Sequence, residues 1–375
     1  MRLTSKTQKT KQMKDNLNLN STDVCWRRTL WLLTPFSWLY RLAGGIRLFL
    51  YRSGVFRQKR LPAKVISVGN VTVGGTGKTP LVIYLAERLK ENSKNVAILT
   101  RGYKRKKKEM VDLLPRAQER INWEDVGDEP YLMMQNLSDV PIIVSKHRVI
   151  SGLHAIEKYR AEFLILDDGF QHLKLHRDID IVVIDSTNPF GNGKLLPAGR
   201  LRESLYSLKR ADLFVLTKTD QASDLDELVH TLQKYNPQAP LVESIYRIRS
   251  IDQQPDGVSV NLKEVEHKRA LVFSGIGNPL SFENSLNQLK IQILKHHRFP
   301  DHFAYQQKDI LFLIEEAKSL KADFIITTEK DSVRIPLINQ SEVLPQTELG
   351  IPFYVLKIDL KITKGEEILL RKIEL

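Results

Sequence analysis

A glycine-rich stretch between an apolar run and a helical segment constrains this chain most. The apolar run is 65–68, and the stretch that follows reads Gly69-Asn70-Val71-Thr72-Val73-Gly74-Gly75-Thr76-Gly77-Lys78-Thr79-Pro80. The run is typical of a buried strand, and 81–90 has the apolar spacing of a helix with Pro80 near its first turn. A strand, a tight loop and a helix in this order are the context of a phosphate-binding loop.

The residue types in this loop suit a phosphate. Glycines let backbone N–H groups turn toward an anion, the helix N-terminus adds its positive end, Lys78 reaches the outer phosphates, and Thr79 offers a hydroxyl to Mg²⁺. The G-x-x-x-x-G-K-[ST] pattern has glycine where this chain has Thr72, so we expect Gly74 and Gly75 to supply the flexibility. The alternative is a glycine-rich turn with an exposed lysine. We predict that a nucleotide binds along Thr72, Val73, Gly74, Gly75, Thr76, Gly77, Lys78 and Thr79.

Two adjacent aspartates end a second apolar run. Residues 163–166 lead directly into Asp167 and Asp168. A carboxylate at the C-terminal edge of a parallel sheet can hold Mg²⁺ directly or through water. Downstream of a phosphate loop, this pattern predicts a magnesium site formed by Thr79, Asp167 and Asp168.

Strands alternate with helices from residue 64 to about 220, which predicts an α/β fold with a doubly wound parallel sheet and its ligand at the strand C-termini. Pro237 and Pro240 mark a boundary. We expect a P-loop nucleotide-binding domain over 61–240 and a smaller α/β domain over 241–375. Alternating apolar residues predict strands at about 244–251 and 354–362, and we expect them to pair as a ribbon that lets the domains close.

The N-terminal region has a different composition. Residues 1–24 are polar and lysine-rich, which predicts a flexible basic tail, whereas 26–60 contain eight aromatic residues, eight Arg or Lys and no acid. The longest uncharged run, 29–40, is shorter than the ~20 apolar residues of a spanning helix. We therefore predict that 25–60 form a helical segment lying in a membrane interface; the alternative is a helix docked on the core.

Charge and cysteine content narrow the partners and the compartment. The formal net charge of +13 favours a negatively charged partner, and no recognised nucleic-acid motif accompanies the basic residues, so we predict no nucleic acid. The single cysteine, Cys25, excludes an intrachain disulfide and fits a reducing compartment.

Thr217-Lys218-Thr219-Asp220 keeps another function open. The tetrad is one residue from the Asn-Lys-x-Asp motif that reads guanine in GTPases, so a GTP-driven switch or maturation factor at the membrane is an alternative to an ATP-dependent kinase. A membrane-docked nucleotide-binding module without chemistry is a third reading. Nucleotide preference separates the first two. The third would be indifferent to Asp128→Ala, a change in the Gly127-Asp128-Glu129-Pro130 stretch that opens an apolar helical segment.

The order of the motifs resembles one family. The glycine-rich loop is followed by Gly127-Asp128-Glu129-Pro130, by Asp167-Asp168-Gly169-Phe170-Gln171-His172 and by Phe299-Pro300-Asp301-His302. Gly275-Ile276-Gly277-Asn278-Pro279 and Thr328-Glu329-Lys330-Asp331 complete the set. Over about 27–362 the chain resembles the tetraacyldisaccharide 4′-kinases of lipid A biosynthesis, which also lack the first P-loop glycine.

The resemblance implies a membrane-associated enzyme. It would transfer the γ-phosphoryl group of ATP, with Mg²⁺, to the 4′-hydroxyl of tetraacyldisaccharide 1-phosphate. The implied location is the cytoplasmic face of the bacterial inner membrane, peripheral or monotopic on its anionic surface, with a glycolipid substrate and no obligate protein partner.

The resemblance also implies roles for single residues. Asp128 would act as a dyad with His302, next to Lys78, and Asp167 and Asp168 would be the metal-side carboxylates. Phe303 stands where many relatives have a second histidine. Candidates for substrate binding or active-site support are Arg101, His172, Arg202 and Glu203.

Overall fold

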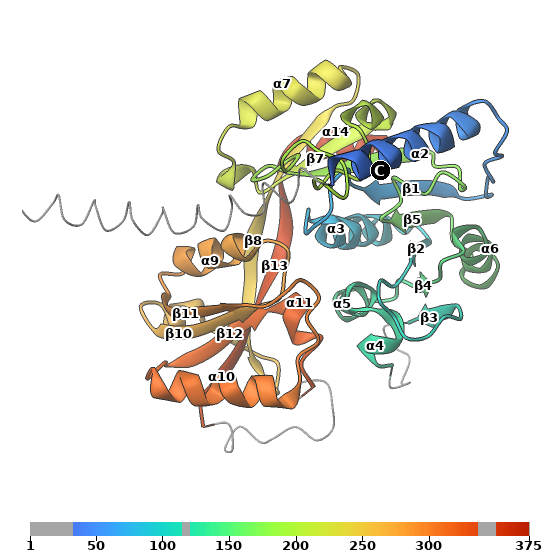
Figure 1. Ribbon diagram of the computed structural model, residues 1–375. Helices are drawn as coiled ribbons and strands as arrows, with labels where there is room; N and C mark the ends of the chain where they lie inside the picture. The colour runs from blue at the N-terminus through green and yellow to red at the C-terminus, as the bar shows by residue number, and fades with distance from the viewer. Residues whose placement is uncertain (1–32, 115–120, 337–349, 375) are drawn as a thin grey trace, which may run out of the picture.

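The computed structural model describes residues 33–114, 121–336 and 350–374. The predicted tail at 1–24, and the part of the membrane segment before residue 33, lie outside these ranges. Figure 1 shows an upper part, which contains the glycine-rich loop, and a lower part, joined by two long strands.

One mixed sheet runs through both parts, in the order β11-β10-β12-β13-β8-β7-β6-β1-β5-β2-β4-β3, with β9 paired to β8. Its strands are β1 Lys64–Gly69, β2 Val96–Thr100, β3 Val111–Leu113, β4 Ile142–Val144, β5 Phe163–Asp167, β6 Ile179–Asp185, β7 Leu213–Thr217, β8 Leu241–Gln254, β9 Val258–Val260, β10 Arg269–Ser274, β11 Gln292–Arg298, β12 Phe324–Thr328 and β13 Phe353–Lys364.

The described α-helices are α2 Thr34–Arg52, α3 Lys78–Glu91, α4 Trp123–Val126, α5 Asp128–Asn136, α6 Arg148–Tyr159, α7 Leu225–Tyr235, α8 Leu262–Val265, α9 Pro279–Gln288, α10 Gln307–Ser319, α11 Glu329–Ser332 and α14 Glu366–Lys372. Two 3₁₀ helices, at Leu205–Arg210 and Thr219–Gln221, follow β6 and β7.

The upper part has the parallel sheet that the alternation of strands and helices predicts. Strands β4, β2, β5, β1, β6 and β7 are parallel neighbours, and every residue of β2, β5, β6 and β7 is buried. Continuous apolar runs are the pattern of strands covered on both faces. The carboxyl ends of these strands meet at one edge of the sheet, where a ligand of such a fold binds.

The lower part has its own apolar core on both faces of β10 and β12. One cluster packs α10 on this sheet, and another packs α9 against the opposite face. Strands β11, β10, β12 and β13 are parallel to one another. This second α/β unit, 269–336 with 350–356, is called the C-terminal unit below.

The two alternating segments expected to form a ribbon are β8 and β13, which pair antiparallel from Phe353↔Gln254 to Lys364↔Glu243. Both run between the upper and lower parts in Figure 1. The register shifts between Lys357 and Ile358, and again between Ile362 and Lys364. Such bulges bend a strand locally, so they mark the places where this ribbon deviates from a straight ladder.

Helix α2 lies on the outside of the upper part (Figure 1). Pro35 occupies its first turn, and of its residues only Ser37 is buried. The Ser37 hydroxyl donates to the Leu195 carbonyl at 3.0 Å and accepts from the Ala198 N–H at 3.1 Å. The alternative of a helix docked on the core is therefore wrong for α2, because most of its large apolar residues stay exposed. Among the described helices, none is both long and apolar enough to cross a bilayer.

Candidate active site

The glycine-rich loop joins the end of β1 to α3, as the sequence predicts. Gly77 precedes α3 with φ of 92°, and a methyl group there would meet the Tyr246 hydroxyl at 2.2 Å, so only glycine fits. The loop is held from both sides: Asn70 Nδ2 donates to Thr76 Oγ1 at 2.9 Å, and Thr217 Oγ1 donates to the Thr76 carbonyl at 2.9 Å. The fixed loop ends at a helix N-terminus, which is where backbone N–H groups bind phosphate.

Thr72, the departure from the P-loop pattern, has a structural explanation. It is buried and forms an antiparallel bridge with Leu201. The neighbouring Val73 N–H donates to the Arg200 carbonyl at 2.8 Å. This part of the loop is therefore extended and paired, and it does not need the conformational freedom of glycine.

Asp167 ends β5 and has one unpaired oxygen. Its Oδ2 accepts from Thr100 Oγ1 at 2.8 Å, whereas Oδ1 is buried and has no hydrogen-bond partner among the described residues. Burial raises the pKa of Asp167 to about 6, and the negative charges of Glu129 and Asp168 add to the rise. A buried carboxylate oxygen with no donor beside other acids is suited to a cation.

Asp168 points to different partners. Arg202 Nη1 donates to both of its oxygens, at 2.7 and 2.8 Å, and Lys78 Nζ lies 3.5 Å from Oδ1. Burial alone would raise the pKa of Asp168, but the charges of Lys78 and Arg202 lower it below the usual value. Asp168 therefore positions Lys78, and Asp167 keeps the free oxygen.

Asp128 and His302 are brought together from sequence positions 174 apart. Asp128 begins α5 and is buried, and His302 Nδ1 donates to its Oδ2 at 2.7 Å. The His302 ring also lies 5.4 Å, centroid to centroid, from the Tyr103 ring. Burial raises the pKa of Asp128, but the hydrogen bond from His302 and the charge of Lys330 outweigh it, and the pKa falls to about 2. Asp128 is thus ionised at neutral pH.

The four support candidates are spread around these groups. Arg202 binds Asp168, as above, and Glu203 accepts from Arg210 Nη1 at 2.8 Å, so Glu203 orients an arginine. The buried Nε2 of His172 has no hydrogen-bond partner within the described ranges, and burial together with the Arg148 charge lowers the pKa of His172 to about 4. Arg101 is exposed just after β2.

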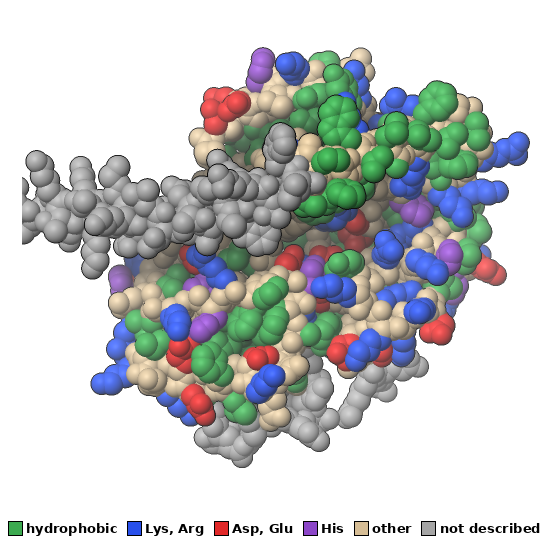
Figure 2. All heavy atoms as spheres, viewed as in Figure 1, with side chains coloured by type: hydrophobic (Ala, Val, Ile, Leu, Met, Phe, Trp, Pro, Cys, Tyr) green, Lys and Arg blue, Asp and Glu red, His purple; other side chains and the backbone are tan. Residues whose placement is uncertain are grey.

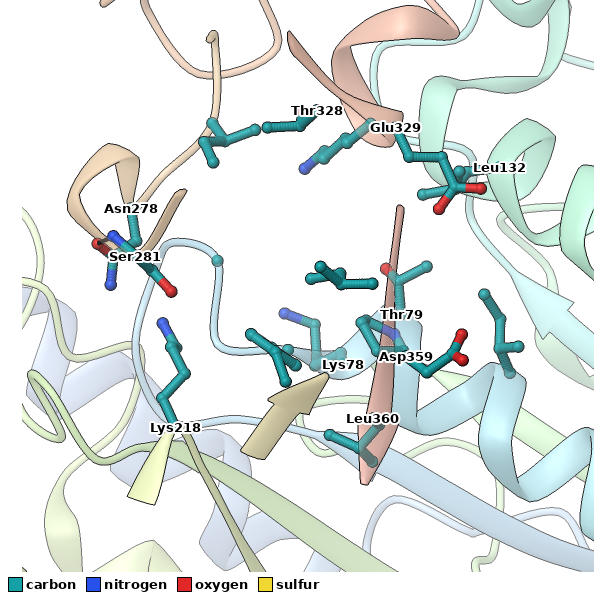
Figure 3. A pocket seen from close by; sticks show the side chains of 18 of the residues that line it. Lys78, Thr79, Leu132, Lys218, Asn278, Ser281, Thr328, Glu329, Asp359 and Leu360 are labelled. Atoms are coloured by element: carbon teal, nitrogen blue, oxygen red, sulfur yellow. Dashed lines mark hydrogen bonds between the residues drawn. The ribbon is translucent and has the colours of Figure 1, made fainter. Parts of the chain in front are cut away.

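A cavity of about 470 Å³ extends from the loop across to the C-terminal unit. Figure 3 shows Lys78 and Thr79 on one wall and Thr328, Glu329, Asn278 and Ser281 around the opposite rim. Three charged residues near the cavity were not singled out from the sequence: Glu129, Lys330 and Arg334. Arg334 is fully buried, donates to Asp331 at 2.7 Å and lies 3.7 Å from Asp128. The motifs Gly127-Asp128-Glu129-Pro130 and Thr328-Glu329-Lys330-Asp331 contain Glu129 and Lys330, whereas no sequence pattern indicated Arg334.

Lys218, from the GTPase-like tetrad, is buried and paired with Asp185 at the ends of β7 and β6. Asp220, the residue that would read guanine, is exposed to solvent. Lys218 also lines the cavity (Figure 3). The tetrad therefore contributes to the cavity a lysine whose charge is already paired with Asp185.

Comparison with known proteins gives consistent matches. A family model described as tetraacyldisaccharide-1-P 4′-kinase matches residues 29–374. A tetraacyldisaccharide 4′-kinase of Syntrophus aciditrophicus is 36% identical over 340 residues, covering 88% of this chain and 89% of that protein. A tetraacyldisaccharide 4′-kinase of Syntrophobacter fumaroxidans is 40% identical over 324 residues, covering 82% of this chain and 84% of that protein. The crystal structure of the "apo" form of LpxK from Aquifex aeolicus in complex with ATP superposes with a TM-score of 0.71 at 33% identity, covering 92% of this chain and 98% of that one.

Proposed function

Since this chain belongs to the tetraacyldisaccharide-1-P 4′-kinase family, we propose that it transfers the γ-phosphoryl group of ATP to the 4′-hydroxyl of tetraacyldisaccharide 1-phosphate. It is a lipid kinase of lipid A biosynthesis. The observation that carries the proposal is the Asp128–His302 pair beside a cavity that also contains the phosphate loop. The family assignment sets aside the GTP-driven switch.

Different residues of the site have different roles in this reaction. Backbone N–H groups of 74–78 and the Lys78 ammonium bind the β- and γ-phosphates. Asp128 accepts the proton of the 4′-hydroxyl while the oxygen attacks the γ-phosphorus, and the bond from that phosphorus to the β-γ bridging oxygen breaks to release ADP. His302 orients the Asp128 carboxylate through its hydrogen bond.

The acidic edge of the sheet fits Mg²⁺. Magnesium in nucleotide sites is bound by one or two protein oxygens plus phosphates, so a large cluster of acids is not needed. Asp167, with its unpaired Oδ1, and the Thr79 hydroxyl would hold the ion. When bound, Mg²⁺ neutralises charge on the phosphates. Asp168 keeps Lys78 in place through their ion pair.

We place the enzyme on the anionic cytoplasmic face of the inner membrane, through α2. Six large apolar residues of this helix are 51–68% exposed: Phe36, Trp38, Leu39, Leu42, Ile46 and Phe49. Figure 2 shows hydrophobic side chains gathered over this corner of the molecule, with Lys and Arg beside them. An exposed apolar stripe flanked by cations and without acids suits a helix lying in a lipid interface.

A mass-spectrometric assay tests the reaction. Purified protein is incubated with ATP, Mg²⁺ and tetraacyldisaccharide 1-phosphate in detergent, and GTP replaces ATP in a parallel series. We expect a product heavier by one phosphoryl group with ATP, and its loss or severe slowing in Asp128→Ala. A wild-type protein that forms no such product, or hydrolyses GTP faster than ATP, would refute the proposed function.

A further inference from the structure

Lys330 is a second lysine of the cavity, on the wall opposite the phosphate loop. It follows β12 at the start of α11, and its side chain is only 22% exposed. Its Nζ lies 3.2 Å from Glu129 Oε1 and 3.9 Å from Asp301 Oδ1. One of these carboxylates belongs to the upper part and the other to the C-terminal unit, so Lys330 bridges the two.

Glu129 interacts electrostatically with two of the lysines that line the cavity, Lys78 and Lys330. It lines the same cavity as Lys78 and Lys330, and the charges of both lysines lower its pKa against the opposing effect of burial. The Glu129 carboxylate of the upper part thus faces the Lys330 ammonium across the cleft, in the same cavity as Lys78. That position is electrostatically suited to an anion with more charge and more oxygens than a carboxylate.

The loop between β10 and α9, which carries Gly277, lies against both the phosphate loop and Asp301. A methyl group built on Gly277 would stand 2.8 Å from the Gly75 backbone nitrogen and 3.3 Å from Asp301 Oδ2. The Asp301 Oδ1 atom is buried and accepts no hydrogen bond from the described residues. The Lys330 ammonium therefore has one carboxylate at hydrogen-bond distance and a second one beyond it.

We propose that Lys330 is a phosphate-binding cation that the C-terminal unit supplies to the γ-phosphate of ATP, facing Lys78 across the cleft. The inference rests on the proposed function, since it requires ATP in this cavity. The γ-phosphate oxygens replace Glu129 as the partner of the Lys330 ammonium. Lys330 stays protonated throughout and stabilises the charge on the phosphoryl group during transfer, while Asp128 takes the hydroxyl proton.

Calorimetric titration of the full chain with ADP and with β,γ-methylene ATP tests this contact, because the two differ in the γ-phosphate. Lys330→Met removes the charge and keeps the length of the side chain. We expect this variant to bind β,γ-methylene ATP about 10- to 100-fold more weakly, which is the contribution of a hydrogen bond to a charged group. The affinity for ADP should change by no more than about twofold, which is the size of the effect expected when two sites do not interact. Lys330→Arg, which keeps the charge, should recover most of the loss.

Lys357→Met is the matched control. Lys357 is 28% exposed, pairs with Asp252 at 2.8 Å and approaches Glu329, but it does not line the cavity. It should leave both affinities unchanged. If Lys330→Met weakens ADP and β,γ-methylene ATP equally, or weakens neither, Lys330 has only a structural role and the inference is wrong. That result leaves the proposed function standing, because the latter is judged by whether the wild type phosphorylates the lipid.

Discussion

At the scale of single residues, the carboxylates of this site are distinguished by their neighbours. Asp128 faces His302, Lys330 and Arg334, and its pKa is about 2, whereas Asp167 faces other acids and its pKa is about 6. An ionised Asp128 can accept a proton, and a loose phosphoryl-transfer transition state requires little activation of the hydroxyl beforehand. The two groups are thereby suited to different tasks: proton transfer and cation binding.

His302→Asn tests the dyad. Asparagine tolerates the left-handed backbone of this residue, whose φ is 60°, but is too short to keep the ring's hydrogen bond. We expect kcat to fall by about 10- to 100-fold, a part of what a general base contributes. Losing a donor to the ionised form raises the pKa of Asp128, so the acid limb of the kcat profile should move to higher pH.

The control for this variant is His297→Asn. His297 is 20% exposed, close to the 18% of His302, and it also pairs with a carboxylate, but that carboxylate is Glu316 of α10. It should leave the pH profile in place. A profile of His302→Asn that coincides with wild type would contradict the orienting role of His302.

Asp167→Asn should stabilise the nucleotide-free protein while impairing activity. The folded state binds the Asp167 proton more tightly than the unfolded chain, so wild-type stability falls as pH rises from about 4 to about 6 and stays low above that. Asparagine does not ionise, so the variant does not lose this stability as the pH rises. We expect a gain on the order of 1–3 kcal/mol at pH 8 and little gain at pH 4, measured by urea unfolding.

Asp168→Asn is expected to change the folding stability in the opposite direction. The pKa of Asp168 is lowered in the folded state, so its charge contributes stability that is present above the unfolded pKa and lost as pH falls below it. The variant should be slightly less stable than wild type at pH 8, because a side chain that is 40% exposed is screened by water. A destabilised Asp167→Asn at pH 8 would argue against an unsatisfied charge there.

At the scale of elements, α2 differs from every other long helix that the structure describes. Helices α3, α6, α7, α9 and α10 each bury at least two residues, whereas α2 buries only Ser37. Its attachment is polar: Ser37 bonds the loop at 195–198, and Arg47 Nη2 donates to the Gln171 carbonyl at 3.1 Å. The apolar residues of α2 therefore contribute nothing to the core and are available to another apolar phase.

Replacing Leu39 and Phe49 with Glu tests the membrane role of α2. Burying each such side chain is worth about 1.5–3 kcal/mol, so the double variant should bind anionic phospholipid vesicles about 100-fold more weakly or worse. Binding of ATP should not change. Vesicle co-sedimentation and calorimetry measure the two quantities.

Val258 and Leu280 provide the control pair, since they are 62% and 59% exposed on other elements. Their replacement by Glu should leave vesicle binding intact. Equal losses in both pairs would mean that general surface charge, and not α2, controls the binding.

At the scale of the whole molecule, the site exists only where two units meet. Several contacts between described residues cross the cleft, among them Asp128 with His302, Glu129 with Lys330, Asn136 with Glu329, and Thr187 with Asn278. The ribbon of β8 and β13 is the covalent connection between the units, and two bulges interrupt its register. We predict that bending at this ribbon opens the cleft for substrates.

Gly277→Ala tests the close approach of the units. Its methyl group would stand 2.8 Å from the backbone of the phosphate loop, so the cleft must open slightly. Misplacing reacting groups by about 1 Å can cost about 100-fold, so we expect kcat to fall by about 10- to 100-fold with little change in unfolding temperature. Small-angle scattering with an ATP analogue should show a larger radius of gyration than for wild type.

Gly45→Ala serves as its control, because a methyl group on Gly45 meets no atom within 4 Å. It should keep wild-type kcat and dimensions. A fully active Gly277→Ala would show that catalysis does not need the approach seen between Gly75 and Gly277.

The local parts of this protein followed from the sequence alone. Strand β1, the phosphate loop, α3 and the acids after β5 were predictable because glycine content, apolar periodicity and side-chain chemistry act over short distances along the chain. The alternation in β13 identified a half-buried strand for the same reason.

Tertiary structure decided which distant residues meet. The order of strands in the sheet and the ribbon bring His302 to Asp128 and Lys330 to Glu129, and no local pattern encodes such pairings. The free oxygen of Asp167, the capture of Asp168 by Arg202 and the burial of Arg334 likewise depend on packing. Composition favoured a membrane-interface helix but left a core-docked helix as the alternative, because aromatic-rich helices are often buried. The surrounding fold leaves α2 exposed.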